Sequence, residues 1–192
     1  MTEANPYLDD YKAASTLFDQ GKYEEAFARY RALAQAGFIT AQVFVGWLYY
    51  KGQGVKQDHE EARQWLEKAA DAGSPVGQFY LGAMYRAQQN YQPAIEYFKK
   101  SALQGYMPAI HYLGIMHDAG EGVTVDRAKA HKYFQQAADM GHLPAQKEIA
   151  VSMIKGHRGL FRIPQGIFMF ARALSKLIKL ALSDADNDRI RW

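Results

Sequence analysis

Apolar residues recur along this chain at the three- and four-residue spacing of an α-helix, and the helical stretches come in pairs. One stretch places Ala41, Val45 and Leu48 on a common face, and the next does the same with Ala62 and Leu66. Glycine-rich polar segments or short turns separate the stretches. The pattern therefore predicts helix hairpins.

The hairpins repeat in a common register. Glycines close successive second stretches at intervals of 36, 32 and 36 residues, and alanines and bulky apolar residues recur with them. The glycines are Gly37, Gly73, Gly105 and Gly141, the alanines Ala26, Ala62, Ala94 and Ala130, and the bulky residues Tyr30, Leu66, Phe98 and Phe134. Such a period predicts a solenoid in which each repeat buries its apolar face against its neighbours.

Turn and capping residues support this prediction. The four closing glycines stand where a helix favours a left-handed residue after its last turn. In two hairpins the connection contains a Gly-x-Gly pair, which permits a tight turn, and an aspartate follows that can cap the next helix. These aspartates are Asp58 and Asp126.

The motif of the second hairpin resembles a Sel1-like repeat almost position for position. It reads Ala41-x3-Val45-Gly46-x2-Tyr49-x2-Gly52-x-Gly54-Val55-x2-Asp58-x3-Ala62-x2-Trp65-x3-Ala69-Ala70-x2-Gly73. The fourth hairpin, 109–141, resembles it equally, with His117 in place of the usual tyrosine. The first and third hairpins lack the Gly-x-Gly-Val insertion and have the spacing of the related tetratricopeptide repeat.

The repeats and this resemblance predict an all-α fold, a right-handed α-solenoid of stacked antiparallel helix hairpins. We expect about four repeats and a divergent C-terminal helix pair in one domain spanning 1–192. The expected segments are repeats 9–40, 41–76, 77–108 and 109–144, a capping unit 145–183 and a polar tail 184–192.

Neither the composition nor the motifs of the sequence indicate a catalytic, cofactor-binding or metal-binding site. The chain contains no cysteine, its six histidines form no ligand set, and no motif orders a nucleophile with a base. The series Asp184-x-Asp186-x-Asp188 begins like a calcium loop, but Arg189 stands where the loop needs glycine. We therefore predict no enzyme, cofactor or metal site.

The first helices of stacked hairpins line the concave face of a solenoid, where extended partners usually bind. By analogy with tetratricopeptide repeats, the predicted partner-binding residues are Val43, Trp47, Tyr50, Phe79, Arg86, His111, Ile115 and Asp118. Their aromatic character favours a peptide or protein segment as the ligand. Alternatively, several of these aromatics only pack between hairpins. The two-carboxylate clamp of chaperone-binding tetratricopeptide domains needs paired Lys/Arg and Asn at these inward positions. Only Arg86 qualifies, so we do not expect that function.

The C-terminal part of the chain is basic. Between Ile149 and Leu182 there are six Lys/Arg and no Asp/Glu, and a helix beginning at Pro164 would be amphipathic. Its predicted contact residues are Arg162, Phe168, Arg172, Lys176 and Lys179. This helix either docks on the solenoid as a cap or meets an anionic membrane or a partner's groove. Three cations within 165–182 argue against a transmembrane span, and the absence of a recognised binding fold argues against nucleic acid.

The resemblance implies the class of function, because Sel1-like proteins are interaction platforms in signalling, protein quality control and bacterial envelope processes. We expect a non-enzymatic adaptor or scaffold that binds a peptide or protein on its concave face. The alternative is a peripheral membrane module that uses the basic helix. The acidic, weakly apolar N-terminus shows no secretory signal, so we expect a cytoplasmic, bacterial protein, with membrane association through the C-terminal helix as a second expectation.

Overall fold

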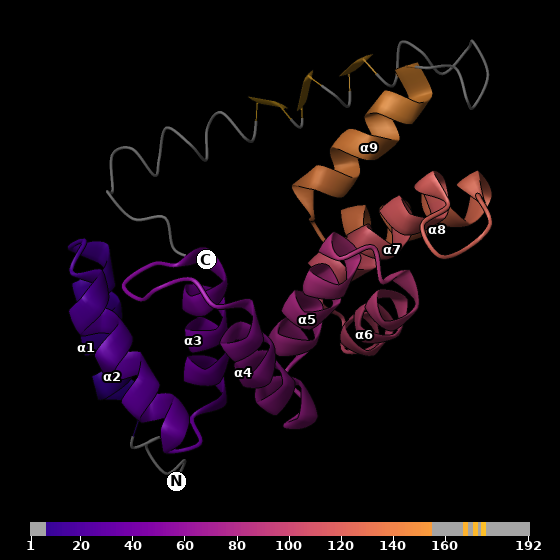
Figure 1. The fold of residues 1–192 in the computed structure, drawn as a ribbon. Helices are drawn as coiled ribbons and strands as arrows, with labels where there is room; N and C mark the ends of the chain where they lie inside the picture. Colours follow the sequence, from indigo (N-terminus) through magenta and orange to yellow (C-terminus); the bar gives the residue numbers. More distant parts are fainter. Residues whose placement is uncertain (1–6, 155–166, 169–170, 173, 176–192) are drawn as a thin grey trace, which may run out of the picture. The chain divides into compact units, whose positions relative to one another are not determined.

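The computed structural model describes residues 7–154, 167–168, 171–172 and 174–175 (Figure 1). Helices are the regular elements throughout this part of the chain, which confirms the all-α prediction. The start of the extended last helix predicted at Pro164 lies outside the described residues.

The chain forms two compact units, residues 1–104 and 105–192, which we call the N-terminal and C-terminal units. In the N-terminal unit the helices are α1 Leu8–Asp19, α2 Tyr23–Gln35, α3 Ile39–Lys51, α4 His59–Asp71, α5 Pro75–Ala87 and α6 Tyr91–Leu103. In the C-terminal unit they are α7 Met107–Ala119, α8 Arg127–Asp139 and α9 Leu143–Ile154. That the whole chain is one domain stays a prediction.

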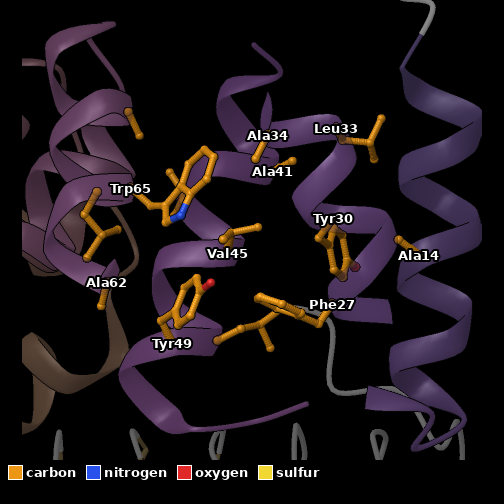
Figure 2. Close-up of a cluster of buried hydrophobic side chains, with 14 of the residues drawn as sticks. Ala14, Phe27, Tyr30, Leu33, Ala34, Ala41, Val45, Tyr49, Ala62 and Trp65 are labelled. Atoms are coloured by element: carbon orange, nitrogen blue, oxygen red, sulfur yellow. The ribbon is translucent and has the colours of Figure 1, made fainter. Parts of the chain in front are cut away.

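Within each unit, consecutive helices pack against each other, as the repeat pattern requires. The aligned alanines Ala26, Ala62, Ala94 and Ala130 are at most 1% exposed, so the register of small residues lies in the core. Figure 2 shows the resulting core of the N-terminal unit, in which Tyr30 of α2 and Trp65 of α4 lie among apolar side chains of α1 and α3. Burial of this contiguous apolar surface holds the hairpins together.

The predicted helix stops are confirmed. Gly37, Gly73, Gly105 and Gly141 all have left-handed φ values, between +78° and +96°. After α2 the amide of Phe38 donates to the carbonyl of Leu33 at 3.0 Å, and the amide of Gly37 donates to that of Ala34 at 3.1 Å. This pair of bonds is a Schellman motif, which satisfies carbonyls that the helix leaves unpaired.

The two connections with the Gly-x-Gly pair run over 52–58 and 120–126, whereas α1–α2 and α5–α6 are joined by 20–22 and 88–90. Asp58 accepts hydrogen bonds from the amides of Glu60 and Glu61, at 2.9 and 3.0 Å, and Asp126 accepts one from Lys129 at 2.8 Å. Both aspartates therefore cap the following helix as predicted.

Glycines also sit inside the first helices, where the two helices of a hairpin cross. A Cβ atom at Gly46, Gly82 or Gly114 would lie 2.7, 3.0 or 2.5 Å from the side chain of Leu66, Phe98 or Phe134. In these three hairpins the bulky residue of the second helix thus packs directly on the backbone of the first. This contact fixes how each hairpin presents its outer side chains.

Candidate functional site

The predicted partner-binding residues of the N-terminal unit come from α3 and α5, where all but the buried Val43 are partly exposed, and α1 carries aromatic residues in the same register. We call this surface the first-helix face. The structure brings Phe18 of α1 within 6.0 Å of Trp47 of α3, measured between ring centroids. Both side chains are half-buried, so each is anchored in the core and still reaches solvent.

Four aromatic side chains meet at this point, and we call Phe18, Tyr23, Phe44 and Trp47 the aromatic patch. The ring of Phe18 lies 5.0 Å from Tyr23 and 5.5 Å from Phe44, and the rings of Phe44 and Trp47 are 5.6 Å apart. Phe18 meets its three neighbours edge to face, a favourable arrangement of aromatic quadrupoles. Tyr23 is 37% exposed, so the patch presents rigid aromatic surface to the outside.

The other predicted residues of this unit differ in their exposure. Val43 is only 7% exposed and belongs to the core, so it supports the face without forming part of it. Tyr50 is half-buried against His59, with ring centroids 5.3 Å apart. Phe79 is half-buried and packs on Phe98 of α6, the second helix of the same hairpin, with ring centroids 5.7 Å apart. Arg86 is half-buried near the end of α5.

In the C-terminal unit, Asp118 is exposed at the end of α7 and lines a pocket of about 590 Å³ together with α8 and α9. The cations Arg127 and Lys132 come from α8, whereas the carboxylates come from Asp118 and from Glu148 of α9. Apolar side chains of Phe134 and Val151 also line it. A lining that combines apolar side chains with cations and carboxylates suits a peptide with an apolar side chain and charged neighbours.

The two other predicted residues of α7 are less accessible than Asp118. Ile115 is partly buried and packs on a core cluster of α8 and α9 that includes Phe134 and Ile149. His111 is 8% exposed and lies against Phe134, with ring centroids 5.6 Å apart. We therefore leave His111, like Val43, out of the proposed binding surface.

Of the predicted contact residues in the basic C-terminal segment, Arg162, Lys176 and Lys179 lie outside the described residues. Phe168 is 68% exposed, and Arg172 is exposed as well. Ile167 and Leu174, which the helical pattern assigns to the main apolar face, are 55% and 46% exposed. The described part of this segment therefore presents apolar and basic side chains to solvent.

Reasoning from sequence missed three features of these surfaces. Phe44 stands three residues before Trp47 on the same helix, so its place in the patch could have been predicted from the i, i+3 relation. Tyr23 comes from the second helix of a hairpin, whereas the analogy with tetratricopeptide repeats considered only the first helices. The walls that α8 and α9 contribute to the pocket depend on how three helices pack, and no local pattern reports that.

No group of three or more potential metal ligands comes together within the described residues. None of the helices described for this chain combines the length and the apolar composition that a membrane crossing needs. What the surfaces provide is contact area: aromatic rings in one unit and a pocket lined by charged and apolar side chains in the other.

Comparison with known proteins places these observations in a family. The model of the Sel1 repeat matches residues 39–74, 75–106 and 108–142. A Sel1 repeat protein of Oxalobacter formigenes with a solved structure is 31% identical, with a TM-score of 0.76 over 85% of this chain and 69% of that one.

Two curated relatives are longer proteins. An uncharacterized protein of Neisseria meningitidis serogroup B is 33% identical over 77% of this chain and 31% of its own length. The DAP3-binding cell death enhancer 1 of Rattus norvegicus is 31% identical over 67% of this chain and 33% of its own length. The chain thus spans about a third of the length of each of these relatives.

Proposed function

The chain belongs to the Sel1 repeat family, and we propose that it is a non-enzymatic adaptor that holds a peptide or protein segment on the first-helix face. Sel1 repeat proteins generally mediate interactions between proteins. The name of the rat relative, a DAP3-binding protein, agrees with such a role.

The aromatic patch is the observation that carries this proposal. Large aromatic side chains that are held rigidly and remain partly exposed are the residues that dominate binding energy at protein interfaces. Phe18, Phe44 and Trp47 hold one another by ring contacts at 5.5 to 6.0 Å, so little side-chain freedom is left to lose on binding.

The chemistry of the patch defines the partner segment. Its rings offer apolar area without a formal charge, so we expect the segment to insert leucine, isoleucine, methionine or an aromatic side chain.

Substitution in the patch tests the proposal. We expect Phe18→Ala and Trp47→Ala to weaken binding at least tenfold each, since truncating a central aromatic anchor costs more than about 1.4 kcal/mol. Partners are first captured from the native organism on the full chain, and each is then purified for titration calorimetry against the variants.

The matched control is Leu103→Ala. Leu103 is an apolar side chain that is 88% exposed on a second helix, so its truncation should leave the affinity within twofold. Circular dichroism confirms that each variant is folded. Equal affinities for the wild-type chain and for both patch variants would contradict the proposal.

A second candidate function is peripheral attachment to an anionic membrane through the basic C-terminal segment. The exposure of Ile167, Phe168 and Leu174 beside Arg172 favours it, because apolar side chains flanked by cations suit a lipid interface.

Vesicle flotation tests this second function. We expect the full chain to float with vesicles containing about one third phosphatidylserine, and to stay behind with phosphatidylcholine alone, because each cation near an anionic surface contributes about 1 kcal/mol. The triple variant Arg172→Glu, Lys176→Glu, Lys179→Glu should lose flotation, whereas Lys99→Glu and Lys100→Glu on α6 should not. Flotation that survives the triple reversal would exclude this mode of attachment.

A further inference from the structure

Two histidines meet in the C-terminal unit where three elements converge. His111 lies on α7, and His142 lies in the turn between α8 and α9, directly before Leu143. Their ring centroids are 4.9 Å apart, with an angle of 51° between the ring planes. Phe134 of α8 closes the other side of His111.

The pair sits in surroundings that suit neutral imidazole rings. Nε2 of His111 and Nδ1 of His142 are both buried, and neither has a hydrogen-bond partner among the described residues. A charged imidazole in such a place would lose hydration without gaining a compensating bond. Burial and the neighbouring His142 lower the pKa of His111 to about 4, and burial also lowers the pKa of His142.

The described side chains in ring contact with His111 carry no carboxylate that could stabilise a charge. From α8 comes Phe134, and from α7 itself comes Tyr112. The neighbouring imidazole of His142 acts on His111 and would repel a second proton. No carboxylate contributes to the lowered pKa of either ring.

We propose that His111 and His142 form an acid-sensitive latch, which holds the start of α9 on α7 at neutral pH and releases α9 when the pair is protonated. Because α9 supplies Ile149 and Met153 to the core of this unit, its release exposes apolar surface. It also dismantles the pocket, to which α9 contributes Glu148, Val151 and Ser152. Acidification thereby changes the surface that the C-terminal unit offers to a partner.

The direction of the pH dependence follows from proton linkage. A histidine in the released state has a pKa near 6.5, above its value in the latched state, so the released state binds more protons between about pH 4 and 6.5. The latch is therefore fully closed above about pH 6.5 and weakens progressively as the pH falls towards 4.

The repeat register itself supplies variants that remove the titration and keep an aromatic ring. Phe79 stands in the third hairpin where His111 stands in the fourth, and Phe38 follows Gly37 as His142 follows Gly141. The double variant His111→Phe, His142→Phe thus uses side chains that the chain already accommodates at equivalent positions.

Hydrogen exchange of the full chain with EDTA present, at pH 7.0 and 5.0, tests the latch. After correction for intrinsic exchange, we expect amides of α9 to lose at least tenfold of their protection at pH 5.0, while those of α3 and α4 keep theirs. The double variant should keep α9 protected at both pH values. His59→Gln, which changes an exposed histidine of α4, should behave as the wild type.

Unchanged protection of α9 in the wild type would overturn the proposal. So would a loss of α9 protection at pH 5.0 in the double variant that is as large as the loss in the wild type. If the double variant does not fold, a titration of the wild-type imidazole resonances by NMR decides the matter. Values near 6.5 for both histidines would then rule the latch out, and values below 6 would support it.

Discussion

Replacing Gly54 with alanine is expected to destabilise the N-terminal unit by about 3 kcal/mol. Gly54 has a φ of +71°, a conformation that costs other residues about 1 kcal/mol or more. In addition, a Cβ atom at this position would overlap the backbone carbonyl of Tyr23 at the start of α2. A backbone group cannot swing aside as a side chain can, so the connection between α3 and α4 would have to leave the preceding hairpin.

Gly73→Ala isolates the contribution of the clash. Gly73 has a φ of +85°, but a Cβ atom there would meet nothing within 4 Å. We expect it to cost only about 1 kcal/mol, the strain of the left-handed conformation alone. Urea unfolding followed by the fluorescence of Trp47 and Trp65 reports on the N-terminal unit. Equal losses in the two variants would show that the contact with Tyr23 does not matter.

The helices and their ends could be predicted because their signals are local and recur. The closing glycines, the aspartate caps at Asp58 and Asp126 and the difference between the long and short connections each repeat at a fixed register, so every hairpin supports the interpretation of the others. Capping and left-handed conformations depend on residues within one turn of a helix, which a sequence displays directly.

Which side chains reach the surface could be predicted only in part. A helix position near the edge of the buried stripe turns inward or outward with a small rotation of the helix, and that rotation depends on the neighbouring helices. Val43 and His111 occupy equivalent positions and are both buried, whereas Phe79, at the same position of the third hairpin, is half-buried. The contact between Gly54 and Tyr23 likewise joins two hairpins, so it could not be predicted from the motif of a single repeat.

The repeats divide their positions between two tasks. The glycines, alanines and bulky residues of the register fix how helices approach, and they vary little from hairpin to hairpin within this chain. The outer positions of the first helices vary from Trp47 to Ala83 to Ile115. In the proposed function, a partner is therefore recognised by side chains that the register leaves unconstrained, on a frame that the register keeps constant.

The crossing of α7 and α8 allows a direct test of whether the glycine in the first helix is required for the packing of a hairpin. A Cβ atom at Gly114 would lie 2.5 Å from Cε1 of Phe134 and 2.7 Å from Cδ1. We expect Gly114→Ala to destabilise the C-terminal unit by about 2 kcal/mol, because overpacking costs up to about 3 kcal/mol and the higher helix propensity of alanine returns about 1 kcal/mol.

A double-mutant cycle identifies Phe134 as the cause. The second hairpin carries Leu66 where the fourth carries Phe134, so Phe134→Leu is a substitution that the register already tolerates. Alone it should cost about 1 kcal/mol for the volume lost. Combined with Gly114→Ala it should cost less than the sum of the two single changes, by at least about 1 kcal/mol, because the shorter side chain removes the overlap. Hydrogen exchange of α7 and α8 measures the three variants at pH 7, above the range in which the proposed His111–His142 latch opens. Strictly additive losses would mean that Gly114 is required for a reason other than its contact with Phe134.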